Sequence, residues 1–152
     1  MFTKDVETYL TETIVTIRLG VLNQSGWPLV VSLWYIYRNG AIYLATRESA
    51  RVVEWLRANP KCGFEIASDE PPYCGVRGQA RAVIDRGLGK ETLYLLLERY
   101  LGGTDSSLAQ NLISRASNEV AIRLEVENHF TWNFQDRMKD IAGNSVDKIC
   151  PD

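Results

Sequence analysis

The fold is decided by residues 26–56, which read GWPLVVSLWYIYRNGAIYLATRESARVVEWL. Two runs rich in β-branched and aromatic residues, 29–38 and 41–46, flank the pair Asn39-Gly40. Asn-Gly between two such runs is the strongest short signal for a β-hairpin, because both turn residues tolerate a positive φ angle. The segment therefore predicts two antiparallel strands joined by a two-residue turn.

Polar residues follow the second run at the point where a helical pattern begins. Thr46, Arg47, Ser49 and Arg51 lie at or just before the start of a predicted helix over residues 49–58. The first N–H groups of a helix have no partners within it and lie at the positive end of its dipole, so this composition predicts an anion socket. A structural interpretation stays open, in which Thr46 ends the strand, Ser49 caps the helix and Arg51 is a solvated side chain.

The rest of the chain predicts short strands with a few helices between them. Helical patterns cover residues 2–13, with Thr3 as the expected cap, 90–101 and 108–114. Strand patterns cover 14–22, 62–67, 75–84, 119–127 and 130–134. Gly78, inside a predicted strand, indicates a bulge or a close backbone approach. Strands and helices do not alternate regularly, which favours a mostly β (α+β) antiparallel barrel with peripheral helices over a parallel sheet.

Length and composition indicate one ordinary folded domain. The chain has 152 residues and a formal net charge of −2, which gives no reason to expect a nucleic-acid partner. No apolar run approaches the roughly 20 residues that span a bilayer, and the polar N-terminus is not a signal peptide. Cys62, Cys74 and Cys150 are odd in number and widely spaced, which predicts reduced thiols in a cytoplasmic protein. Residues 138–152 form a polar tail that we expect to be loosely held.

The first hairpin run is apolar on both faces. One face carries Leu29, Val31, Leu33, Tyr35 and Tyr37, and the other carries mainly Val30, Trp34 and Ile36. A strand with one solvated face would alternate more cleanly. We therefore expect either helices or a second subunit to cover the outer face, and a homodimer is the predicted assembly.

The chain has little equipment for side-chain catalysis. His129 is the only histidine, so a Ser-His-Asp or Cys-His set would have to use it, and a metal site built from histidine pairs is excluded. Residues 87–92 imitate a phosphate loop but lack its first glycine, at Ile84, and the Ser or Thr after Lys90, so they predict only a helix start. We assign no catalytic side chain and expect a bound cofactor to carry any difficult chemistry.

An ordered series of motifs resembles the FMN-binding split β-barrel family related to pyridoxamine 5′-phosphate oxidase. The resemblance covers roughly residues 6–137. Its pieces, in order, are Gly26-x-Pro28, Gly40-x-Ile42-Tyr43-x-Ala45-Thr46, Ser49-x-Arg51-Val52-x-x-x-Leu56, Asn59-Pro60, Val76-x-Gly78-x-Ala80 and Trp132-x-Phe134-x-x-Arg137.

The resemblance implies a six-stranded split barrel over residues 1–137 and a homodimer with two flavins at the subunit interface. The implied cofactor-binding residues are Val31, Ser32 and Leu33 along the flavin ring, Thr46, Ser49 and Arg51 at its phosphate, Arg47 as a nearby cation, and Trp132 from the partner's last strand. Arg51 stands where the family often has lysine, and arginine can bind a phosphate with two parallel hydrogen bonds. Trp34 and Trp55 are expected to be packing residues.

The predicted function is that of an FMN-dependent oxidoreductase acting on an unassigned small molecule. Tyr73 stands where the family oxidase has a substrate-binding glutamine, and the C-terminal arginine–histidine motif is missing, which argues against pyridoxamine 5′-phosphate oxidase activity itself. One alternative is a reductase that uses the 8-hydroxy-5-deazaflavin coenzyme, with its polyglutamyl tail along Arg47, Arg51, Arg57 and Lys61. Another is a non-catalytic flavin- or haem-binding module, with His129 as the haem ligand.

Overall fold

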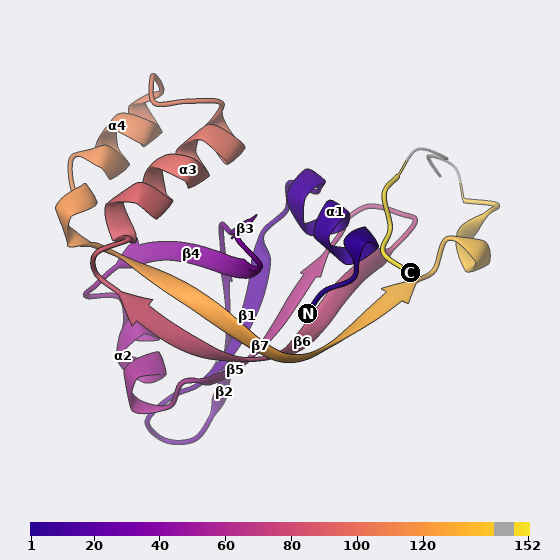
Figure 1. Cartoon of the computed structure of the whole chain (residues 1–152), viewed down its shortest axis with the longest axis horizontal. Coiled ribbons are helices and arrows are strands. Elements are labelled where there is room, and N and C mark those ends of the chain that lie inside the picture. Colours follow the sequence, from indigo (N-terminus) through magenta and orange to yellow (C-terminus); the bar gives the residue numbers. More distant parts are fainter. Residues whose placement is uncertain (142–147) are drawn as a thin grey trace.

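Seven strands form one antiparallel sheet that curls into a split barrel (Figure 1). The computed structural model describes residues 1–141 and 148–152. The strands are β1 (Ile17–Leu22), β2 (Pro28–Leu33), β3 (Ile36–Arg38), β4 (Ala41–Arg47), β5 (Lys61–Ala67), β6 (Cys74–Asp85) and β7 (Glu119–Asn133). Their order across the sheet is β2-β1-β5-β6-β7-β4-β3. The predicted fold class is therefore confirmed, with seven strands in place of the six expected.

The helices lie around the sheet and begin and end close to the predicted positions. They are α1 (Lys4–Glu12), α2 (Arg51–Ala58), α3 (Gly89–Leu101) and α4 (Ser107–Ile113), with short 3₁₀ turns η1 (Ala116–Asn118) and η2 (Asp136–Met138). The predicted cap of α1 is confirmed, because the Thr3 hydroxyl accepts a hydrogen bond from the Val6 N–H at 3.4 Å. Helix α3 packs against β4 and β7, and α4 lies beside it outside the barrel (Figure 1).

The Asn39-Gly40 hairpin forms as predicted, but the run before it is not one strand. Asn39 and Gly40 have φ angles of 51° and 78°, the turn geometry that this pair favours. Residues 29–38 divide at Trp34 and Tyr35 into β2, which pairs with β1, and β3, which pairs with β4. The chain therefore passes at this break from one edge of the sheet to the other, which adds the seventh strand.

The break is held by the buried ring of Tyr35 and by Tyr100 from α3. The Tyr100 hydroxyl accepts a hydrogen bond from the Tyr35 N–H at 3.2 Å and donates to the Val15 carbonyl oxygen at 2.7 Å. Because the Tyr35 backbone bonds to a side chain, it leaves the strand ladder at this point.

Arg99 ties the same break to the C-terminal end of α1. Its guanidinium donates to the carbonyl oxygens of Leu10, Thr11 and Thr13 and lies over the ring of Tyr35, with 5.1 Å to the ring centre. The last carbonyls of a helix have no partner within it, so a cation at this end stabilises them. Burial raises the pKa of the Tyr35 hydroxyl well above its ordinary value, which keeps it protonated as a donor toward the same carbonyls.

The last two predicted strands are one continuous strand, β7, so the expected interruption between residues 127 and 130 is wrong. Its register with β6 shifts at Gln79 and Ala80, which leaves Glu127 as an extra residue in a bulge. A Cβ on Gly78 would lie 2.3 Å from the Asn128 carbonyl oxygen. Gly78 therefore marks both a close approach and an adjacent bulge, and the bulge lets the ladder continue past it.

The interior is divided between the barrel and the space under α3 and α4. The main core fills the barrel and is closed by the buried faces of α1 and α2. A second, smaller cluster lies beneath the α3–α4 hairpin and consists of Leu93, Leu97, Ala109 and Ala116, with Trp34 and Ala45 packed against it. The amino end of α3 rests directly on β7, because a Cβ on Gly89 would lie 2.0 Å from the Glu119 carbonyl oxygen.

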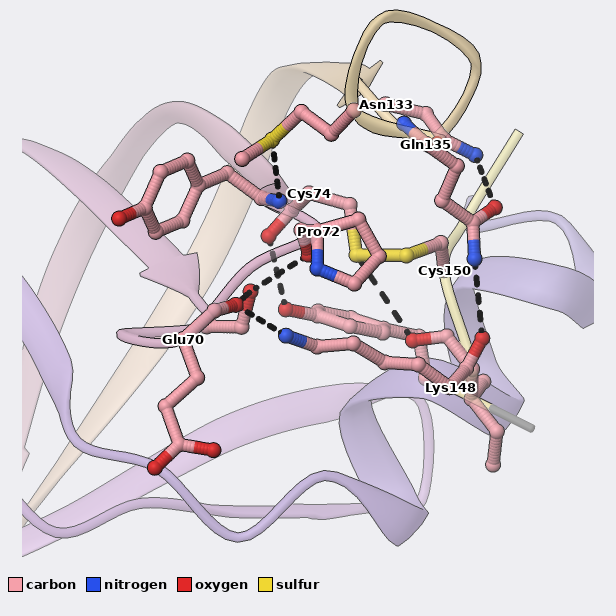
Figure 2. The surroundings of a disulfide bond; sticks show 12 residues. Glu70, Pro72, Cys74, Asn133, Gln135, Lys148 and Cys150 are labelled. Carbon is pink, nitrogen blue, oxygen red and sulfur yellow. Dashed lines mark hydrogen bonds between the residues drawn. A yellow bond between two sulfur atoms is a disulfide. The ribbon is translucent and has the colours of Figure 1, made fainter. Parts of the chain in front are cut away.

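Cys74 and Cys150 form a disulfide across 76 residues, so the prediction of reduced thiols is wrong for these two cysteines (Figure 2). Cys62 is free and buried. The expectation of a loose tail is also wrong for residues 148–152, where Gln135 donates a hydrogen bond to the Lys148 carbonyl oxygen at 3.2 Å; residues 142–147 lie outside the described part. The cytoplasmic location rested partly on reduced thiols and stays a prediction.

Among the described residues, no helix combines the length and the apolar character needed to cross a membrane.

Replacement of Gly89 tests the contact between α3 and β7. We expect Gly89→Ala to lower the free energy of unfolding by about 1–3 kcal/mol, the usual cost of overpacking, because the new Cβ would meet backbone atoms. Gly87→Ala is the matched control, since the nearest atom to its Cβ is a side-chain oxygen of Asp85 at 3.3 Å. Urea denaturation measures both, and equal stability of the two variants would contradict the close packing.

Thiol counting tests the disulfide. The denatured chain should show one reactive thiol, from Cys62, before reduction and three afterwards. Because the bond closes a long loop, Cys150→Ser should lower the free energy of unfolding by about 2–4 kcal/mol. Reductant should destabilise the wild type similarly and leave the variant unchanged. Three thiols without reduction would contradict the pairing.

Candidate functional site

The predicted phosphate residues lie where β4 passes into α2. Thr46 and Arg47 end β4 and pair with Val120 and Glu119 at the start of β7. The chain then turns, with the Ala50 N–H donating to the Arg47 carbonyl oxygen at 2.9 Å, and α2 begins at Arg51. The turn places the end of the strand beside the first N–H groups of the helix.

The N-terminus of α2 has no side-chain cap. Its N-cap residue is Ala50, so the alternative in which Ser49 caps the helix is wrong. Ser49 and Arg51 are both exposed at this end, and in the described part of the chain neither Arg47 nor Arg51 takes part in an ion pair. Free N–H groups, a hydroxyl and unpaired guanidinium groups suit an anion such as a phosphate.

Two neighbouring arginines, Arg57 and Arg86, differ from Arg47 and Arg51 because each forms an ion pair with Glu48. Its carboxylate accepts a hydrogen bond from Arg57 at 2.9 Å and pairs with Arg86 as well. These hydrogen bonds lower the pKa of the exposed Glu48 carboxyl below its ordinary value. Arg57 is thus already occupied within the chain, whereas Arg51 is not.

The segment predicted to follow the flavin ring ends just before a residue that shares a cavity with the end of β4. Residues 31–33 end β2, which is an edge strand. Trp34, the next residue, lines a cavity together with Thr46 and Arg47. The end of the predicted ring segment is therefore one residue away from a side chain that lies at the same cavity as Thr46 and Arg47.

Trp34 and Trp55 are packing residues, as predicted. The Trp34 ring stacks on Tyr100 of α3, with 4.9 Å between ring centres and 7° between planes. Trp55 packs against the main core from α2. Both indoles therefore stabilise the positions of the helices.

Trp132 lies at the opposite end of β7 from this turn. It pairs with Gly75, whereas Thr46 pairs with Val120, and Trp132 follows Val120 by twelve positions, about 40 Å measured along an extended strand. Its ring lies 5.2 Å from the Arg77 guanidinium, and its buried indole N–H has no hydrogen-bond partner among the described residues. One chain therefore does not bring Trp132 to its own phosphate residues.

A cavity of about 200 Å³ beneath the α3–α4 hairpin was not foreseen from the sequence. Its lining residues are Trp34, Ala45, Thr46, Arg47, Leu93, Leu96, Leu112, Arg115 and Glu119. Glu119 is only 7% exposed, and its burial raises the pKa of its carboxyl above the ordinary value. The positive charges of Arg47 and Arg115 lower the same pKa and so oppose part of this shift. In the sequence Glu119 belongs to the polar, alternating face of its strand, so it carries no signal of burial before α3 is placed over it.

A wider groove of about 520 Å³ lies over β1, β5 and β6, with Lys61 in its lining. Beside it the outer edge of the sheet exposes large apolar side chains, and Trp27 and Val30 are 70% and 69% exposed. In the described part of the chain β2 pairs only with β1. The apolar face predicted for this strand is thus left uncovered within one chain.

His129 and the glycine-containing residues 87–92 both have roles in packing and helix formation. The His129 ring lies edge-on to Phe2, with 4.7 Å between ring centres. Residues 87–92 open α3, as predicted. Among residues 1–141 and 148–152, no group of three or more His, Cys, Asp and Glu side chains is arranged to hold a metal ion.

Comparison with known proteins supports the fold. No family model and no curated protein matches the chain. Among solved structures, the conserved hypothetical protein Rv2991 from Mycobacterium tuberculosis has a TM-score of 0.72 at 20% identity, with 88% of this chain and 85% of that chain covered. An F420 reductase has a TM-score of 0.71 at 15% identity, with coverage of 85% and 98%. A FAD-binding protein from Mesorhizobium loti has a TM-score of 0.63 at 18% identity, with coverage of 86% and 94%.

These TM-scores show a shared fold, and at such low sequence identities they show no more than that. At the level of the fold, the resemblance to the split-barrel family is confirmed.

The pKa shifts of Glu119 and Glu48 have opposite signs, so we expect the two carboxyls to affect the pH dependence of stability in opposite directions. Ionisation of Glu119 opposes folding because its folded pKa is raised, so wild-type stability should fall relative to Glu119→Gln as pH rises above the ordinary value of 4.5. Glu48 has a lowered pKa, so the wild type should gain stability relative to Glu48→Gln as pH rises through the acid range. Urea denaturation at about pH 4 and about pH 8 checks both signs. The same sign for both variants would contradict the burial of Glu119.

Proposed function

We propose that this chain binds FMN, with the flavin phosphate at the N-terminus of α2, and acts as a flavin-dependent oxidoreductase on a small molecule. The observation that carries the proposal is the start of α2, where Ser49 and Arg51 are exposed beside the end of β4 and where the described residues supply neither a side-chain cap nor an ion pair for Arg51. A helix N-terminus left free beside an unpaired arginine is suited to a dianionic phosphate.

Each part of the site has a separate task in this proposal. Thr46, Ser49 and Arg51 hold the phosphate, with Arg47 as a further cation, and residues 31–33 lie along the ring. When bound, the flavin would supply hydride or electron transfer. The protein residues bind and orient the cofactor, and the apolar edge of β2 excludes water from it.

A homodimer completes the proposed site. Trp132 lies toward the opposite end of β7 from the phosphate residues of its own chain, which supports a ring contact supplied by a second subunit. The exposed Trp27 and Val30 beside the edge strand are the kind of apolar surface that such a subunit would cover.

A second candidate keeps the fold and replaces FMN by the 8-hydroxy-5-deazaflavin coenzyme. Two observations favour it: Lys61 is unpaired in the described part of the chain and lines the large groove, and an F420 reductase shares the fold over 98% of its length. A polyglutamyl tail would need such a cation beyond the phosphate. The haem alternative has less support, because its only candidate ligand, His129, packs against Phe2.

Replacement of Arg51 tests the phosphate site. Arg51→Ala should weaken FMN binding by about 1.5–3 kcal/mol, the usual contribution of a hydrogen bond to a charged group, and thus by about 10- to 150-fold. Arg57→Ala is the matched control, since that arginine is already paired with Glu48. Flavin fluorescence titration measures both, and Arg51→Lys should retain most of the affinity.

Two results would decide against parts of this proposal. Unchanged FMN affinity in Arg51→Ala removes this arginine from the phosphate site. Tighter binding of the deazaflavin coenzyme than of FMN, with a loss on Lys61→Ala confined to the deazaflavin, selects the second candidate.

A further inference from the structure

The cavity beneath the α3–α4 hairpin contains a buried carboxylate that has no partner in the described part of the chain. Glu119 is 7% exposed and makes neither a side-chain hydrogen bond nor an ion pair there. A buried polar group without a partner is costly, and a buried charge more so. The structure therefore places a hydrogen-bond acceptor in the lining of a cavity, without a donor for it among the described residues.

Two arginines, Arg47 and Arg115, line the same cavity and can donate hydrogen bonds to an anion. Arg47 and Arg115 both line it and act on Glu119 through their positive charges, but neither forms an ion pair within the described residues. Arg115 donates one hydrogen bond, to the side-chain oxygen of Asn111, which is neutral. The cavity thus offers two cations that suit a carboxylate and one acceptor that suits a donor.

Most of the remaining lining residues are apolar, and the space is small. Trp34, Leu93, Leu96 and Leu112 line it together with Ala45 and the hydroxyl-bearing Thr46, and the volume is about 200 Å³. A cavity of about 150 Å³ lined by aliphatic and aromatic side chains accommodates benzene, so this space suits a molecule with a few carbon atoms in its apolar part.

We propose that this cavity binds a small α-amino acid with an apolar side chain. Its carboxylate pairs with Arg115 and Arg47, its ammonium group donates to Glu119, and its side chain packs on the apolar wall. A simple carboxylic acid would leave Glu119 without a donor, and a simple amine would leave the arginines unpaired. Thr46 and Arg47 line this cavity and also belong to the proposed phosphate site, so the test is made without added cofactor.

Titration of the purified full-length chain with L-valine tests the proposal. Isovalerate, which lacks the amine, and isobutylamine, which lacks the carboxylate, are the matched ligands. In two-dimensional NMR we expect valine to shift resonances of the cavity residues and to bind at least about tenfold more tightly than either control, a difference of about 1.4 kcal/mol.

Variants assign the two ends of the ligand. Glu119→Gln should weaken valine binding about tenfold or more and leave isovalerate unchanged, whereas Arg115→Gln should weaken both. Arg123→Gln is the control, because that arginine pairs with Glu125 on β7 and does not line the cavity. Leu112→Trp, which fills the cavity without removing a charge, should abolish valine binding, and NMR spectra verify that each variant is folded.

Three outcomes would overturn the proposal: no valine-induced shifts at the cavity residues, isovalerate binding as tightly as valine, or unchanged valine affinity in a folded Leu112→Trp variant.

Discussion

The structure depends on the hydrogen bonds that hold the chain where it leaves β2 and enters β3. Tyr100 takes the backbone N–H of Tyr35 out of the strand ladder, and Arg99 binds the carbonyl oxygens at the end of α1 against the same buried ring. Without this break the run would continue as one edge strand. With it, the chain crosses between the two edges of the sheet, and Trp34 at the break lines a cavity together with Thr46 and Arg47 at the end of β4.

The end of β4 contributes residues to two neighbouring regions of the molecule. Toward α2 it leads into the proposed anion socket, where, in the described part of the chain, the helix start has no side-chain cap and Arg51 forms no ion pair. Toward α3 and α4 it contributes Arg47 to the small cavity over Glu119. The arginines of both regions form no ion pair in the described part of the chain, whereas Glu48 pairs with Arg57 and Arg86 close by. This contrast distinguishes the arginines suited to ligands from those that stabilise the fold.

Several features could be predicted because they depend on neighbouring residues in the chain. The Asn39-Gly40 turn, the Thr3 cap and the start of α2 are local events, governed by backbone conformation and by groups three or four positions away. The proposed phosphate residues are also close in sequence, so their clustering was visible there. The break at Tyr35, the pairing of Cys74 with Cys150 and the burial of Glu119 depend on partners 65, 76 and about 30 positions away, and no local pattern reports them.

The sequence by itself determined the fold class, most strands and helices, and the cluster of hydroxyls and arginines before α2, because periodicity, turn residues and capping act over short distances. The tertiary structure decided where the strand pattern is interrupted, which arginines remain unpaired, and that a carboxylate on a polar strand face is covered by α3 and α4. Those outcomes follow from long-range packing, since a side chain's exposure and its electrostatic partners exist only once distant segments have been brought together.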